Sequence, residues 1–174
     1  MQANYYRSFD QLRTNELYVV RHGWYNSSFE LTDGQFNYGT ISFRRFCRRS
    51  GTVETANGSW EFSKPFFSRV ATISKPGGEL IGKVDQGYFD RCNKLVMNGG
   101  FAADFKRTGF FPTEFTWSKD SQGEILRSRQ RHFNFNSPLT VILNPTVKIT
   151  EMPLLTFLSI YLLLLRQRRK GAAH

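Results

Sequence analysis

The stretch TEMPLLTFLSIYLLLLRQRRK, from Thr150 to Lys170, decides the fold of this 174-residue chain. Between Glu151 and Arg166 it carries no charge, so its apolar core runs from Met152 to Leu165. A helix of that length spans roughly 21 Å at 1.5 Å per residue, whereas the hydrocarbon layer of a bilayer is about 30 Å thick. The stretch is therefore predicted to be a buried helix rather than a membrane span.

The residues at both ends of this core favour a helix. Thr150 can act as a cap, Pro153 suits the first turn, and the basic run from Arg166 to Lys170 suits the negative end of the helix dipole. Leucines and aromatic residues cover every side of the helix instead of forming one stripe. A helix that is apolar all round must be surrounded by other parts of the protein.

The rest of the chain has the pattern of short strands separated by turn residues. Candidates begin with Glu16–His22 and recur every 8–12 residues or so, which is typical of an all-β sandwich or barrel. Asn57-Gly58 is the strongest hairpin signal. LTVIL and TVKIT, on either side of Asn144-Pro145, are predicted as the last two strands.

Together these patterns predict an all-β fold, in which an antiparallel meander barrel of about twelve strands encloses the C-terminal helix. A closed barrel also leaves no exposed sheet edge. We expect a polar N-terminal arm at 1–15, one barrel domain at 16–170 with the central helix at 152–165, and a tail at 171–174. Two alternatives for the helix stay open, namely a tail anchor flanked by RQRRK and an exposed dimerisation helix.

The strand hairpins, such as Ser118–Ile125, and the terminal PLLTFLSIYLLLLRQRR carry a family resemblance. This arrangement resembles the tubby-like C-terminal superfamily, which includes the tubby domain, the phospholipid scramblases and the LURP-one-related proteins. The resemblance is one of architecture and covers about Glu16 to Lys170. It implies the barrel and a link to membranes and phosphoinositides. It does not imply scramblase activity, because the cysteine-rich stretch and the acidic calcium-binding loop of scramblases are missing.

The basic residues are the most informative functional signal. Arg127, Arg129 and Arg131 alternate with Ser128 and Gln130, so a strand would place all three guanidinium groups on one face. That face is either a solvated outer surface or a site for an anion, since guanidinium groups match phosphate geometry.

A second basic cluster, in SFRRFCRRSG, provides Arg44 and Arg45 as further candidate ligands of an anion. The phenylalanines beside them leave single-stranded nucleic acid open as the ligand, because aromatic rings stack on bases.

The formal net charge of +10 also favours polyanions as partners. No catalytic or metal-binding motif is present, so we expect neither a catalytic residue nor a cofactor. Cys47 and Cys92 are predicted to be reduced thiols, with a single bridge between them left open. The polar N-terminus lacks an apolar run of signal-peptide length, so a cytoplasmic location is expected.

The sequence therefore predicts a non-catalytic binding module for anionic groups, with phospholipid or phosphoinositide headgroups at a membrane surface as the preferred ligand. Membrane association would be peripheral. The alternatives are an enzyme with a site at the barrel mouth, a nucleic-acid-binding protein and a tail-anchored membrane protein. If the three basic clusters lie at one end of the barrel, the membrane-surface prediction gains support.

Overall fold

Twelve strands and one long helix make up the computed structural model, which describes residues 5–22, 28–43, 49–87, 92–108, 113–131 and 138–171. For 168–171 only the backbone is described. The elements are η1 Phe9–Gln11, β1 Glu16–His22, β2 Ser28–Thr32, β3 Asn37–Phe43, β4 Ser50–Thr55, β5 Gly58–Ser63, β6 Val70–Ser74, β7 Leu80–Gln86, β8 Cys92–Met97, β9 Ala102–Arg107, β10 Glu114–Lys119, β11 Gly123–Gln130, β12 Leu139–Leu143 and α1 Met152–Gly171.

The strands form one closed antiparallel barrel, as predicted. Each strand pairs with its neighbours in the sequence, and β1 closes the barrel by pairing with β12, with Tyr18 opposite Thr140. Along most strands buried and more exposed residues alternate, as the two-residue period of a strand requires. The buried members, including Leu17, Val19 and Ile73, point into the barrel.

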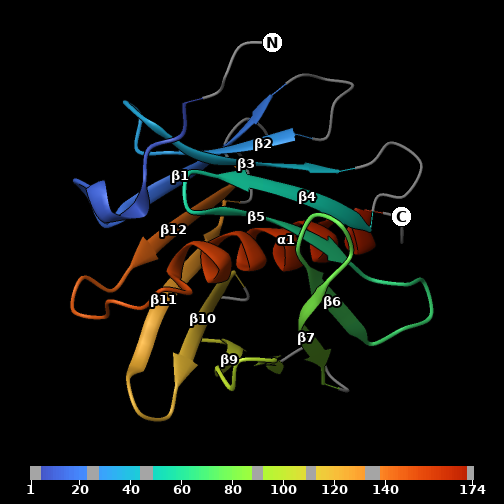
Figure 1. Ribbon diagram of the computed structural model, residues 1–174. Helices are drawn as coiled ribbons and strands as arrows, with labels where there is room; N and C mark the ends of the chain where they lie inside the picture. Colours follow the sequence, from blue (N-terminus) through green and yellow to red (C-terminus); the bar gives the residue numbers. More distant parts are fainter. Residues whose placement is uncertain are drawn as a thin grey trace.

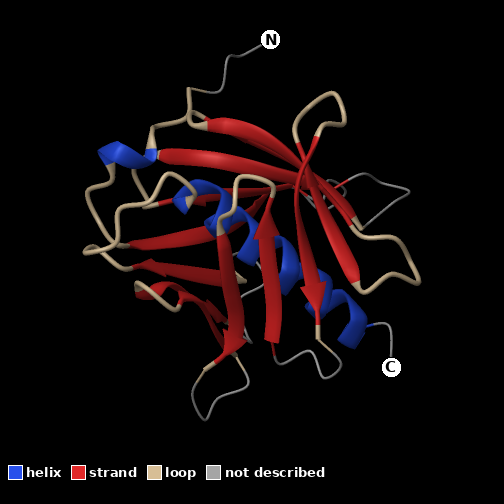
Figure 2. Cartoon of the chain, turned by 60° about the horizontal axis from the view of Figure 1, so that its bottom comes forward, coloured by secondary structure: helices blue, strands red, loops and turns tan. Residues whose placement is uncertain are grey.

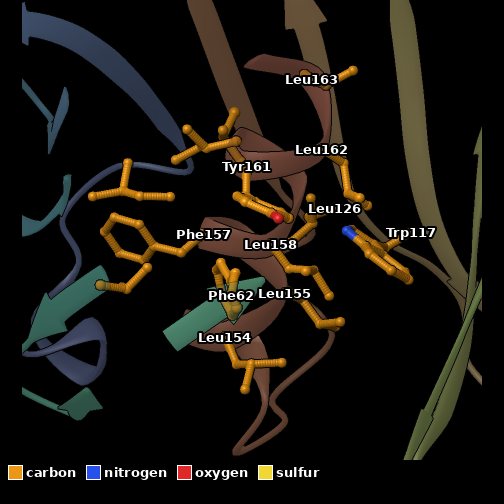
Figure 3. Packing of buried hydrophobic residues seen from close by; sticks show 14 of the residues in the cluster. Phe62, Trp117, Leu126, Leu154, Leu155, Phe157, Leu158, Tyr161, Leu162 and Leu163 are labelled. Atoms are coloured by element: carbon orange, nitrogen blue, oxygen red, sulfur yellow. The ribbon is translucent and has the colours of Figure 1, made fainter. Parts of the chain in front are cut away.

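Helix α1 runs through the interior of this barrel, with strands on all sides of it (Figures 1 and 2). Every residue from Met152 to Leu165 is buried, as the absence of a single apolar stripe predicts. Figure 3 shows its side chains pointing in opposite directions, with Phe157 on one side and Leu162 directed toward Trp117 on the other. The helix continues to Gly171, six residues beyond the predicted end at Leu165.

The two polar residues inside the helix satisfy their hydroxyl groups locally. Thr156 Oγ1 donates to the Met152 carbonyl over 2.8 Å, and Ser159 Oγ donates to the Thr156 carbonyl over 2.8 Å. Both residues are fully buried. Because these bonds stay within the helix, the apolar interior of the barrel does not have to supply a partner.

Gly39 on β3 allows the helix to approach the sheet. Its backbone has a positive φ of 156°, and an added Cβ would lie 2.6 Å from the Glu54 carbonyl oxygen and 2.7 Å from the Phe157 ring. No side chain fits between the strand and the helix at this point.

Two local predictions were wrong. TVKIT, predicted as the last strand, is irregular chain leading into α1, because β12 already pairs with β11 and β1 and has no free edge. The hairpin near Asn57-Gly58 exists, but its turn residues are Ala56 and Asn57, and Gly58 already pairs with Thr55.

The predicted polar arm is partly packed onto the barrel. In its short helix η1, Phe9 is buried and contacts the Tyr38 ring edge-on, with ring centroids 6.0 Å apart. The Phe9 amide also donates to Asn57 Oδ1 over 3.0 Å. This segment therefore covers the end of the barrel where α1 begins.

We call the two ends of the barrel the N-end and the C-end, after the end of α1 that lies at each. At the N-end lie the start of α1 and the connections β2–β3, β4–β5, β6–β7, β8–β9 and β10–β11. At the C-end lie the last turns of α1 and the strand ends that flank the other connections, which are β1–β2, β3–β4, β5–β6, β7–β8, β9–β10 and β11–β12. The alternation follows from the antiparallel meander, in which each strand reverses the direction of the one before.

Candidate functional site

Two of the predicted arginines lie on the outer face of β11. Arg127 and Arg129 alternate with the buried Ser128 and Gln130, so the two-residue period is present along this part of the strand. Gln130 points inward, where its Nε2 donates to the Leu163 carbonyl of α1 over 3.4 Å. The inward residues of β11 thus hold the helix, and the outward residues face solvent.

Both of these arginines form ion pairs. Arg127 Nη2 lies 2.9 Å from Glu124 Oε2, and this hydrogen bond and charge raise the pKa of Arg127. Arg129 Nη2 lies 2.6 Å from Glu114 Oε1 on β10. Each carboxylate offsets the charge of its arginine, so Arg127 and Arg129 attract an anion less than two unpaired guanidinium groups would.

Arg131 differs from the other two. It follows the last residue of β11, is exposed, and its guanidinium carbon lies 5.3 Å from the centre of the Tyr18 ring. Within the described residues it has no acidic partner. The other two predicted ligands, Arg44 and Arg45, lie outside the described residues.

The topology places Arg131 within a larger basic surface at the C-end. We assign a residue to an end if it lies in a connection between strands at that end, or within two positions of such a connection. Residues in the turns of α1 at that end are assigned to it as well. Among residues whose side chains the structure describes, the cationic residues of the C-end are Arg21, Arg49, Arg69, Lys106, Arg107, Arg129, Arg131 and Arg166, together with the buried Lys64. The acidic residues found there on the same terms are Asp85 and Glu114.

The N-end has the opposite balance. Its described cations are Arg7, Arg13, Lys75, Lys119 and Lys148, and its described acids are Asp10, Glu16, Asp33, Glu54, Glu79, Asp120, Glu124 and Glu151. The positive charge of the protein is therefore concentrated at one end of the barrel rather than spread over it. A surface of one sign raises the local concentration of oppositely charged groups.

Most of this basic surface comes from residues that no local sequence pattern groups together. Arg21 and Arg69 stand alone in the sequence, on β1 and before β6, and Arg107 has only Lys106 beside it on β9. A signal was nevertheless present, because in a meander every second connection lies at the same end. Arg21, Arg107 and Arg131 are exposed, and no described acidic side chain pairs with any of them.

A small cavity lies at the C-end, beside the last turns of α1. Lys64 is 3% exposed and donates through Nζ to Gln86 Oε1, and both line this cavity with Asn93, Phe105 and Leu163. The volume of this cavity is about 30 Å³, enough for a water molecule but not for a substrate. Tyr161 fixes the helix nearby by donating its hydroxyl to the Arg49 carbonyl.

A larger groove of about 730 Å³ lies at the N-end, between η1 and the chain that leads into α1. Phe9, Val147 and Met152 supply apolar surface, and Asp10 and Lys148 supply opposite charges. The groove thus has no net preference for an anion or a cation.

The remaining reactive side chains in the described part of the chain form no cluster. His22 Nε2 lies 2.7 Å from Glu30 Oε2 on the outer face. The Cys92 thiol is free, and burial together with the nearby Asp104 raises its pKa, which keeps it protonated at neutral pH. Cys47 lies outside the described residues. Among the residues that the structure describes, no three His, Cys, Asp or Glu side chains are grouped as metal ligands.

The described part of the chain contains no helix that is both long enough and apolar enough to cross a bilayer. No protein-family model, curated protein or solved structure matches the chain.

Proposed function

We propose that this protein is a non-catalytic binding module whose C-end docks on the anionic phospholipid headgroups of a membrane surface. The observation that carries the proposal is the concentration of cations at the C-end, opposite an N-end with more acids than cations. A barrel with this charge distribution is drawn to a negative surface with its C-end first. The superfamily resemblance agrees with this function and stays a prediction.

The preferred contacts are Arg21, Arg107 and Arg131 rather than the complete β11 set. All three are exposed and lie at the C-end on different strands or just beyond one. Arg127 and Arg129 already hold Glu124 and Glu114, so they gain less from a new anion. A basic residue close to an anionic bilayer contributes about 1 kcal/mol of binding free energy.

The test is flotation of the purified protein with vesicles of phosphatidylcholine alone, with phosphatidylserine, or with phosphoinositide. Wild-type protein is expected to float with the anionic vesicles alone and to be released by high salt, which shortens the Debye length from about 10 Å at 0.1 M to about 3 Å at 1 M. The variant Arg21→Gln/Arg107→Gln/Arg131→Gln should bind roughly 100-fold more weakly, the equivalent of about 3 kcal/mol.

The matched control is Lys75→Gln/Lys119→Gln/Lys148→Gln, which removes the same charge from the N-end. It should bind like wild type if the C-end is the docking surface. Equal losses in both triple variants would mean that only net charge matters, and wild-type protein that ignores every vesicle would refute the membrane function.

A further inference from the structure

The β5–β6 connection at the C-end exposes two adjacent phenylalanines. Phe66 is 69% exposed and Phe67 is 95% exposed, in the segment Lys64–Arg69. Figure 1 shows this loop in green, on the same side of the barrel as the end of α1. Most large apolar side chains of the described residues are buried, so this pair is an exception that calls for a physical reason.

Hydrogen bonds within this loop hold the two phenylalanines in their exposed positions. The Ser68 amide donates to the Pro65 carbonyl over 3.2 Å, which places both phenylalanines at the tip of a turn. Ser68 Oγ also accepts from the Val70 amide over 2.9 Å. Within the tip the two rings contact each other edge-on, with centroids 4.9 Å apart.

Cations surround this apolar tip. Arg49 donates through Nη1 to the Phe66 carbonyl over 2.8 Å, and its guanidinium carbon lies 4.1 Å from the centre of the Phe66 ring. Arg69 ends the loop at the start of β6. An apolar tip held within a basic surface matches the interface of an anionic bilayer, where headgroups meet the cations and the acyl region receives aromatic rings.

We infer that Phe66 and Phe67 form a wedge that inserts into the interfacial layer of an anionic membrane when the C-end docks on it. The inference rests on the proposed function and adds a second contribution to it. Cations bring the barrel to the surface, and the two rings then bury apolar area in the bilayer. Electrostatic attraction weakens with salt, but burial of the rings does not.

The first test compares wild type with Phe66→Ser/Phe67→Ser in flotation on phosphatidylserine vesicles. Because both rings are exposed, the double variant should fold like wild type, which circular dichroism checks. Each buried ring accounts for roughly tenfold in affinity. The double variant should therefore retain binding at low salt and lose it at physiological salt, where wild type stays bound. Unchanged binding of the double variant at physiological salt would overturn the wedge and leave the proposed function standing.

The second test measures depth directly. Phe67→Trp adds a fluorophore at the tip, and brominated acyl chains quench only tryptophan that reaches the bilayer. The added emission should be quenched, whereas the added emission of Phe36→Trp, a partly exposed position at the N-end, should not. Quenching at both positions, or at neither, would refute insertion by the C-end.

A nucleic acid is the competing ligand for rings beside arginines, because bases stack on aromatic faces. Single-stranded oligonucleotide is therefore added to wild type and to Phe66→Ser/Phe67→Ser. If wild type binds the oligonucleotide through the two rings and ignores vesicles, both the wedge and the proposed function are wrong. The wedge is supported by two results together. Wild type should bind vesicles, and the loss of the two rings in the double variant should leave binding of the oligonucleotide unchanged.

Discussion

At the scale of single residues, Tyr38 and Asp33 form a hydrogen-bonded pair at the turn between β2 and β3. The Tyr38 hydroxyl donates to Asp33 Oδ2 over 2.7 Å, and the amides of Gln35 and Phe36 donate to Asp33 Oδ1, each over 2.8 Å. Burial of Tyr38 and its bond to the Asp33 carboxylate raise the pKa of Tyr38 to about 12. For Asp33, burial acts to raise the pKa, but the hydrogen bonds outweigh it and the net pKa is lowered.

This pair makes stability depend on pH at both extremes. The folded pKa of Asp33 lies below its unfolded value, so its contribution is present above the unfolded pKa and is lost as pH falls through the folded pKa. The folded pKa of Tyr38 lies above its unfolded value, so its contribution is complete below about pH 10 and is lost as pH rises toward about 12.

Tyr38→Phe should lower the free energy of unfolding by about 2 kcal/mol at pH 7, because it removes a hydrogen bond to a carboxylate. The difference from wild type should shrink in strong acid, where Asp33 is protonated. In an ultraviolet titration, the variant should lack the tyrosine that ionises near pH 12. Tyr5→Phe, at a site that is 94% exposed, is the control and should leave the free energy of unfolding and the late tyrosine ionisation unchanged. A wild-type titration with no late tyrosine would contradict this assignment.

Individual positions show what the sequence could and could not predict. The outward placement of Arg127 and Arg129 follows from the two-residue period of side chains along a strand. It could be predicted once the segment was recognised as a strand. Their partners depend on register. Glu114 is fifteen positions from Arg129 and meets it because β10 and β11 pair with these two residues opposite each other. No local pattern carries that information.

At the scale of elements, α1 is the core around which the strands pack. Its composition alone identified it, because fourteen residues without a charge and without a polar face can be stable only when surrounded. TVKIT was wrongly predicted as a strand because composition does not show whether a pairing partner is free. Its alternating pattern suits a strand, and the partner that a strand needs was already occupied by the closure of β12 on β1.

Leu158 lies at the middle of α1 and is fully buried. Leu158→Asp should prevent folding, since an unpaired carboxylate in this interior costs several kcal/mol. Leu158→Met keeps the volume and should cost less than about 1.5 kcal/mol. Chemical denaturation followed by circular dichroism measures both variants. A folded Leu158→Asp protein would refute the central position of the helix.

At the scale of the whole molecule, the closed barrel and the helix inside it each bury the apolar surface of the other. Residues from many strands, among them Leu17, Ile73 and Trp117, point toward the axis that α1 occupies. A barrel of this many strands cannot fill its interior with its own side chains as smaller barrels do. This mutual dependence was predicted from strand number and helix composition, but the polarity of charge between the two ends was not, because it depends on which connections of the meander share an end.

Truncation after Thr150 removes α1 and should leave an insoluble product, because the apolar lining of the barrel would face water. Truncation after Gly171 retains the helix and is the control, which should remain folded. Sedimentation after expression distinguishes the two outcomes. A stable, monomeric barrel formed by residues up to Thr150 would show that the helix is not needed for closure.

The order of elements along the chain has a consequence for biosynthesis. All twelve strands precede α1, so the ribosome produces the entire shell before the segment that fills it. Neighbouring strands can pair as hairpins while they emerge, but their apolar faces have nothing to pack on until α1 leaves the exit tunnel. At about 5–20 residues per second, these faces stay unprotected for several seconds. During that interval we expect the exposed apolar strands of the nascent chain to be open to aggregation or to chaperone binding.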